Sequence, residues 1–389
     1  MTLAGKGAWI AGTDRPEIET VRLGFMPLAD CAPLVMASVL GFDEQYGVRF
    51  ELSRELSWTG MRDRLVKRQL DAAQALYGML YGVQAGIGTG QCDMALLMNL
   101  NQNGQNITLA GALAVPAQNP AALARLVRGQ WRRLKLAHTF PTGNHAMLLY
   151  YWLAAAGIDP LRDCEVVTVP PNQMAASLAA GHIDGFCAGE PWGQHALVEA
   201  GAVLAASSES VWPDHPGKAL GTRADFADQY PNTCRAMIAA LLEAARWLDA
   251  SRANREAAAE VLASPAYVNA SRDTLLACLA GSDERKAWRG HNGLRFHADG
   301  AANFPWLSDG MWFMTQHRRW GLDGAVDETL GYRAVADKVN RIDLYREAAE
   351  RTGTPLPDEV LRSSTLIDGR VWDGADPAAY LASFDPVGS

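Results

Sequence analysis

Apolar segments alternate with short polar segments along the first part of the chain, in lengths typical of strands and helices. Residues 21–26 have the pattern of a buried strand, and residues 31–40 form an apolar segment of helical length that Gly41 can end. A polar loop containing Asp30 separates the two. The chain therefore opens with a predicted strand, loop and helix, which is the beginning of an α/β fold.

A second strand and helix follow in the same order. Residues 50–52 resemble a strand, and Thr59 occupies a position suited to cap the next helix. Met61 and Leu65 would then share the buried face of that helix. Trp58 is expected to stand in the loop just before the helix begins.

One local pattern of helix, aspartate and small-residue strand occurs twice. An apolar helix leads to Asp71-Ala-Ala-Gln-Ala-Leu, and a later one leads to Asp184-Gly-Phe-Cys-Ala. The repetition indicates two similarly built α/β lobes. Residues 116–120 and the Arg-rich segment after them are interpreted as a crossing between the lobes. We therefore expect lobe I to comprise residues 18–112 plus 226–389, and lobe II to comprise residues 113–225.

The remainder of the chain is predicted to be chiefly helical. Residues 234–248, 255–262 and 274–280 are amphipathic or rich in alanine. The segment from Thr352 onward is rich in proline, glycine and aspartate and is expected to be mostly loop.

Composition is that of a well-packed globular protein. The chain has 389 residues, of which 49% are hydrophobic and 20% charged, and its formal net charge is −8. This charge argues against a nonspecific nucleic-acid surface, which needs a basic field to displace counterions from phosphates. The basic cluster at residues 125–135 is interpreted as a solvated helix face or a linker.

The first 20 residues lack an apolar stretch of the length that a secretory signal requires, so a cytoplasmic location is expected. No run of about 18 apolar residues predicts a membrane span. The cysteines form no CxxC pair, have no histidine at zinc-ligand spacing and show no neighbouring base, so neither a metal site nor a catalytic thiol is predicted. They are Cys31, Cys92, Cys164, Cys187, Cys234 and Cys278.

The segment Gly143-Asn144-His145 places an imidazole where an apolar helix is expected to begin. Backbone N–H groups in the first turn of a helix lack partners and carry partial positive charge, so a small anion can be held there. The alternative is a histidine that merely caps the helix or packs against its neighbours.

Four side chains at predicted loop positions can donate a hydrogen bond to an anion: Trp58, Gln105, His145 and Lys218. In an open α/β lobe, ligands bind at the carboxyl ends of the strands, and these loops belong to that edge. Each residue also has a structural alternative, since a tryptophan is commonly core and a glutamine or lysine in a loop is commonly solvated.

Several sequence blocks, taken together and in order, resemble one known family. They are Val21-Arg-Leu-Gly-Phe-Met-Pro-Leu-Ala-Asp, Ser57-Trp58 with Arg62-Asp63, Asn103-Gly104-Gln105, Gly143-Asn144-His145, Gly189-Glu190-Pro191-Trp192 and His215-Pro216-Gly217-Lys218. The family is that of the nitrate/bicarbonate-binding proteins. It comprises the solute-binding components of the NrtA/CmpA type and the cytoplasmic nitrate/nitrite sensor NasS.

The resemblance implies a type II periplasmic-binding-protein fold, an α/β fold whose two lobes close on one oxyanion. Trp58, Gln105, His145 and Lys218 stand inside matching blocks and are implied to bind it. The neighbouring positions Gly143, Asn144, Glu190 and Trp192 are given supporting roles.

The expected ligand is nitrate or nitrite. Nitrate has three acceptor oxygens and no proton, so a pocket of donors with one cation would satisfy it. Bicarbonate carries an O–H and needs an acceptor, and its binding proteins resemble this chain but place a carboxylate where Lys218 stands.

Three roles are compatible with this interpretation. The apparent lack of a leader favours a NasS-like cytoplasmic sensor, which releases an RNA-binding antiterminator protein of the NasT type when the anion binds. The alternative is the solute-binding subunit of an ABC-type nitrate importer. An enzyme is the third, because a pyrimidine-forming family in thiamine synthesis resembles this fold, but no nucleophile with a base and no cofactor site are predicted.

Overall fold

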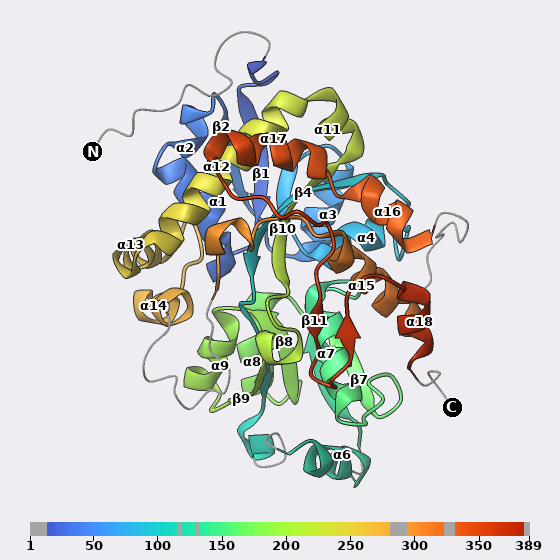
Figure 1. Ribbon diagram of the computed structural model, residues 1–389. Coiled ribbons are helices and arrows are strands. Elements are labelled where there is room, and N and C mark those ends of the chain that lie inside the picture. The colour runs from blue at the N-terminus through green and yellow to red at the C-terminus, as the bar shows by residue number, and fades with distance from the viewer. Residues whose placement is uncertain (1–13, 115–118, 130–131, 281–293, 323–330, 385–389) are drawn as a thin grey trace.

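The computed structural model describes residues 14–114, 119–129, 132–280, 294–322 and 331–384. These residues form two α/β lobes, each built around a five-stranded sheet (Figure 1). The first sheet has the order β2 (Arg49–Arg54), β1 (Thr20–Phe25), β3 (Ala72–Ala75), β10 (Pro216–Arg223), β4 (Met94–Gln102). The second has the order β7 (Cys164–Thr168), β6 (Leu134–His138), β8 (Gly185–Gly189), β5 (Gln105–Leu109), β9 (Val203–Ser207).

The two sheets have the same construction. In each, three parallel strands are followed by an antiparallel strand and then by an edge strand, and the antiparallel strand (β10 or β5) comes directly after the edge strand of the other sheet along the chain. The strands β3 and β8, which follow Asp71 and Asp184, occupy equivalent positions in the two sheets. The prediction of two similarly built lobes therefore agrees with the sheet topology.

The chain passes between the lobes at other positions than the sequence pattern suggested, because β5 and β10 each join the sheet of the next lobe. β5 belongs to the second sheet, so the chain has changed lobes by residues 103–104, whereas the expected boundary lay at 112/113. β10 belongs to the first sheet, so the return crossing at residues 208–215 precedes the expected boundary at 225/226. Part of the expected crossing at 116–120 lies outside the described residues. Asn103 and Gly104, both left-handed at φ 61° and 85°, form the tight first crossing.

Helices cover both sheets. Lobe I carries α1 (Ala32–Val39), α2 (Phe42–Gln45), α3 (Trp58–Val66), α4 (Tyr77–Gln84), α11 (Ala224–Gln229), α12 (Pro231–Ala250), α13 (Arg252–Leu262), α14 (Arg272–Ala280), α15 (Leu307–Arg319), α16 (Gly331–Val339) and α17 (Ile342–Thr352). Lobe II carries α6 (Pro120–Gly129), α7 (Asn144–Ala155), α8 (Met174–Ala179), α9 (Trp192–Glu199) and α10 (Ser208–Val211). The long α12 packs against α1, α2 and α17, which builds the core of lobe I.

Two local predictions about helix ends can be compared with the structure. The first helix ends where expected, because Gly41 follows it in the left-handed conformation at φ 72°. The predicted cap of α3 was wrong. Ser57, not Thr59, is the N-cap, and its hydroxyl accepts a hydrogen bond from Gly60 N. Trp58 is therefore the first residue of the helix rather than part of the loop.

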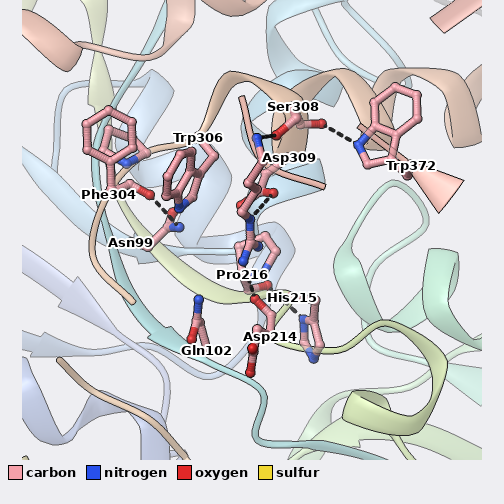
Figure 2. A network of polar contacts seen from close by, with 12 residues as sticks. Asn99, Gln102, Asp214, His215, Pro216, Phe304, Trp306, Ser308, Asp309 and Trp372 are labelled. Carbon is pink, nitrogen blue, oxygen red and sulfur yellow. Dashed lines mark hydrogen bonds and ion pairs between the residues drawn. The ribbon is translucent and has the colours of Figure 1, made fainter. Parts of the chain in front are cut away.

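The C-terminal segment, expected to be mostly loop, also contains the short strands β11 (Ser364–Thr365) and β12 (Val371–Trp372) and the helix α18 (Pro377–Ala382). It runs down from lobe I along lobe II (Figure 1). The Tyr151 hydroxyl of α7 donates to the Asp368 carboxylate, and Trp372 Nε1 donates to Ser308 O of α15 (Figure 2). This segment thus ties α7 of lobe II to α15 of lobe I.

A buried ion pair anchors the same segment. Arg362 pairs with Asp309, which is 1% exposed, and also donates to the carbonyl of Asp214 in the return crossing. In Figure 2, Asp214, His215 and Pro216 lie below Ser308 and Asp309. The return crossing is therefore held against α15.

Within the part of the chain that the structure describes, we find no helix with the length and apolarity to span a membrane.

Candidate functional site

The site lies where the first turn of α7 in lobe II meets lobe I, and small residues permit that contact. A Cβ on Gly78 of α4 would stand 2.1 Å from Thr142 O, and one on Gly143 would stand 2.5 Å from Leu76 Cδ1. His317 of α15 donates from Nε2 to Thr142 O at 2.8 Å. The lobes are thus in close contact immediately before α7 begins.

His145 stands in the first turn of α7, as predicted, and is fully buried. Its Nδ1 is hydrogen-bonded to Thr139 Oγ1, while its Nε2 is buried and has no partner among the described residues. Burial and the nearby Lys218 ammonium hold the pKa of this imidazole well below its usual value. The ring is therefore neutral, and Nε2 can donate one hydrogen bond when Nδ1 accepts from Thr139.

Trp58 faces the same region from lobe I. Its side chain is fully buried at the start of α3, and its indole Nε1 also has no partner among the described residues. The ring centroid lies 6.4 Å from that of His145, and Lys218 Nζ lies 5.8 Å from the Trp58 ring. Trp58, His145 and Lys218 are therefore neighbours although they come from three separate parts of the chain.

Lys218 lies on β10, in the first sheet, where it pairs with Asn101 of β4. Its Nζ is 2.7 Å from Asp30 Oδ2, and both side chains are almost fully buried. Gln74 Nε2 donates to the other Asp30 oxygen at 2.6 Å. Burial raises the pKa of the Asp30 carboxyl, and the Lys218 ammonium and this hydrogen bond oppose the rise.

The site was predicted to contain only hydrogen-bond donors and one cation, and this prediction was wrong because the site also contains the Asp30 carboxylate. The sequence pattern placed Asp30 in a polar loop after the first strand, but it offered no partner for the residue. The structure puts this carboxylate on the 3-10 helix η2 (Ala29–Cys31) and beside the predicted cation. Lys218 therefore does not bring an unpaired charge to the site.

Gln105 is the first residue of β5 and belongs to lobe II by its pairing with Gly189, whereas lobe I was expected. Its Nε2 donates to Gly217 O at 3.1 Å, and its Oε1 is buried without a partner among the described residues. Gln105 can thus offer an acceptor, Oε1, and the second N–H of its amide, which is the type of donor predicted at this position.

Asn144 connects the three elements around the site. Its Nδ2 donates to the carbonyls of Pro216 and Gly217, and its Oδ1 accepts from Gly78 N. It therefore holds the start of α7 against α4 and against the backbone that precedes Lys218. These contacts are compatible with a supporting role for Asn144, which stays a prediction.

Glu190 and Trp192 lie at the start of α9. The Glu190 carboxylate accepts from Asn106 Nδ2 and from Gln194 N, and its backbone carbonyl accepts from Ala29 N at 2.8 Å. This last bond joins lobe II to the residue before Asp30. Trp192 is buried against His195, with ring centroids 5.6 Å apart. Nothing in these contacts directs either side chain toward Lys218.

The assembled site offers hydrogen-bond donors and acceptors together. Trp58 Nε1, His145 Nε2 and the Lys218 ammonium can bind anion oxygens, while Asp30 and Gln105 Oε1 can accept a proton-bearing group. Among the described residues, no cluster of three or more histidine, cysteine, aspartate or glutamate side chains could hold a metal ion. The arrangement is suited to binding a small oxyanion.

The chain is similar to known proteins in both sequence and fold. Residues 14–263 match the NMT1-like family. The chain is 33% identical over 390 residues to the nitrate/nitrite binding protein NrtA of Synechocystis sp., covering 96% of this chain and 86% of that protein. The crystal structure of the periplasmic nitrate-binding protein NrtA from Synechocystis matches with a TM-score of 0.88, covering 95% of this chain and 99% of that one. This match confirms the predicted two-lobed periplasmic-binding-protein fold.

Two further relatives carry different names. The nitrate import ATP-binding protein NrtC of Synechocystis sp. is 34% identical over 371 residues, covering 93% of this chain and 54% of that protein. The bicarbonate-binding protein CmpA of Synechococcus elongatus is 30% identical over 397 residues, covering 96% of this chain and 88% of that protein. NrtA and CmpA are named for binding rather than for catalysis, which agrees with the prediction that this chain is not an enzyme.

Proposed function

The chain belongs to the NMT1-like family, and we propose that it is an oxyanion-binding protein that takes nitrate or nitrite between its two lobes. One observation carries this proposal. Two buried donors, Trp58 Nε1 and His145 Nε2, have no partner among the described residues and lie near the Lys218 ammonium. A buried donor without a partner costs free energy, and a small anion offers the acceptor that both need.

The lobes contribute to the site jointly. Trp58 and Lys218 belong to lobe I, and His145 and Gln105 belong to lobe II. An anion that contacts both lobes binds the closed form better than the open one, so binding shifts the protein toward closure.

Isothermal titration calorimetry with nitrate, nitrite, bicarbonate and sulfate tests the proposal. We expect saturable binding of nitrate and nitrite with one site per chain. Trp58→Phe keeps the ring and removes the N–H, so nitrate should bind roughly ten- to a hundredfold more weakly, as for a lost hydrogen bond to a charged group. Lys218→Glu places a second carboxylate beside Asp30 and should abolish nitrate binding.

Trp212→Phe is the matched control for Trp58→Phe. Trp212 is also fully buried, and its Nε1 has no partner within the described ranges, but its ring packs against Trp312 and His215. Trp212→Phe should leave the nitrate affinity within about twofold, because in the proposed site the anion is bound by the N–H of Trp58 and not by that of Trp212. The proposal fails if the unmodified protein shows neither heat nor thermal stabilisation with millimolar nitrate.

The relatives favour the role of a binding subunit of a nitrate importer. Their names describe nitrate binding and nitrate import. The relatives named above are not described as sensors or as partners of an antiterminator, so they give no support to the role of a cytoplasmic sensor that releases a NasT-type protein. The importer is therefore the role we propose, although the composition of the first 20 residues favoured the sensor.

Cell fractionation and co-purification separate the two roles. An importer subunit should be recovered outside the cytoplasm or with a membrane permease complex. Recovery in the cytoplasm together with an antiterminator that nitrate releases would replace the importer by the sensor.

A further inference from the structure

The Asp30 carboxylate is an unexpected component of an anion site. It is 1% exposed, and its Oδ2 contacts Lys218 Nζ at 2.7 Å. Its Oδ1 accepts from Gln74 Nε2, and the Gln74 amide is itself fixed because its Oε1 accepts from Met26 N at 2.9 Å. The carboxylate is thus held in one orientation by a buried network.

Asp30 also lies next to the His145 donor. The position that a Cβ on Gly189 would take is 3.6 Å from Asp30 Oδ2 and 3.6 Å from His145 Nε2. Both atoms therefore lie close to the same point beside Gly189 of β8. An anion bound by His145 Nε2 and Lys218 Nζ is consequently a close neighbour of Asp30.

We propose that Asp30 is a specificity-determining residue: its carboxylate competes with the anion for the Lys218 ammonium and favours anions that carry a proton. This inference rests on the proposed function. A nitrate oxygen near Lys218 meets the like charge of Asp30 and has no hydrogen to share with it. Bicarbonate meets the same charge, but its O–H can donate a short, charge-assisted hydrogen bond to the carboxylate.

Asp30 therefore lowers the affinity for both anions, and the decrease is larger for nitrate than for bicarbonate. Asp30→Asn keeps the shape and removes the charge. We expect the variant to bind nitrate about tenfold more tightly or better, because a buried like charge is gone. Bicarbonate affinity should stay within about threefold, because the lost charge-assisted bond offsets the relief of repulsion.

Calorimetry with nitrate, and competition of bicarbonate against nitrate, measure both affinities in the unmodified protein and in the variant. Asp43→Asn is the matched control. Asp43 is 2% exposed and accepts from the backbone N–H groups of Glu44 and Phe50, so its loss perturbs a buried aspartate of the same lobe. It should not change the ratio of nitrate to bicarbonate affinity.

A rise in that ratio for Asp30→Asn alone supports the inference, since a purely structural role would move both affinities together. An unchanged or weaker nitrate affinity overturns it. If the unmodified protein binds neither anion, the proposed function itself fails, and that outcome is seen before any variant is made.

Folding of the variant is informative as well. Removing the carboxylate leaves Lys218 buried without its counter-ion, so Asp30→Asn and Asp30→Ser are both purified with and without nitrate. Folding that depends on added nitrate supports the inference, because the anion then replaces the carboxylate. Failure of both variants to fold in either condition overturns it.

Discussion

Replacing Lys218 by methionine should destabilise the protein by about 3–5 kcal/mol at pH 7. Methionine has a similar length and no charge, so the Asp30 carboxylate stays buried without its partner. At 2.7 Å, two opposite charges attract by about 6 kcal/mol if the effective dielectric constant is about 20. Gln74 still donates to Asp30, and burial raises the pKa of that carboxyl, so proton uptake limits the loss to less than the full attraction.

Urea unfolding followed by tryptophan fluorescence, without nitrate, measures this loss. The double variant Asp30→Asn/Lys218→Met removes both charges and should recover most of the stability, to within about 1–2 kcal/mol of the unmodified protein. Lys338→Met is the control. Lys338 is also 2.7 Å from a carboxylate, that of Asp93, but both side chains are about half exposed. Its loss should cost about 1 kcal/mol or less.

Either of two results would contradict this prediction for Lys218→Met. One is a Lys218→Met variant no less stable than Lys338→Met, which would mean that burial adds nothing to the cost of breaking the pair. The other is a double variant no more stable than Lys218→Met, which would mean that the Asp30 charge is not the source of the loss.

Two further predictions concern the contact between the lobes and its acid sensitivity. Gly78→Ala places a methyl group against Thr142 O and should oppose closure by about 1–3 kcal/mol, so calorimetry should show about 5- to 150-fold weaker nitrate binding. Gly90→Ala, where a Cβ meets nothing within 4 Å, should leave the affinity unchanged. Burial lowers the pKa of His317 to about 4. Below pH 6.5 the imidazole of the unfolded chain therefore binds a proton while that of the folded protein stays unprotonated, so the free energy of unfolding falls as the pH falls. His317→Gln should reduce the loss of unfolding free energy between pH 7 and pH 5.5 by about 1 kcal/mol, and equal losses in urea unfolding would contradict this.

Local patterns were sufficient for much of the fold. The apolar run at residues 21–26 corresponds to β1 (Thr20–Phe25), and Gly41 ends the first helix because glycine adopts the left-handed conformation without strain. The helix start at Asn144 follows from Gly143 and the apolar run after it. These features depend on neighbours in sequence, which is why periodicity and capping residues reveal them.

The errors in the lobe boundaries and in the composition of the site share one physical cause. β5 and β10 each join the sheet opposite to that of the strand just before them in the chain, so the lobe of a residue depends on long-range strand pairing rather than on its neighbours. The same exchange brings Lys218 on β10 to Asp30, which lies 188 positions earlier. A single buried ion pair at that separation leaves no period or spacing in the sequence. A site interpreted from donors in matching blocks therefore missed the carboxylate, and with it the residue that we propose governs the choice between anions.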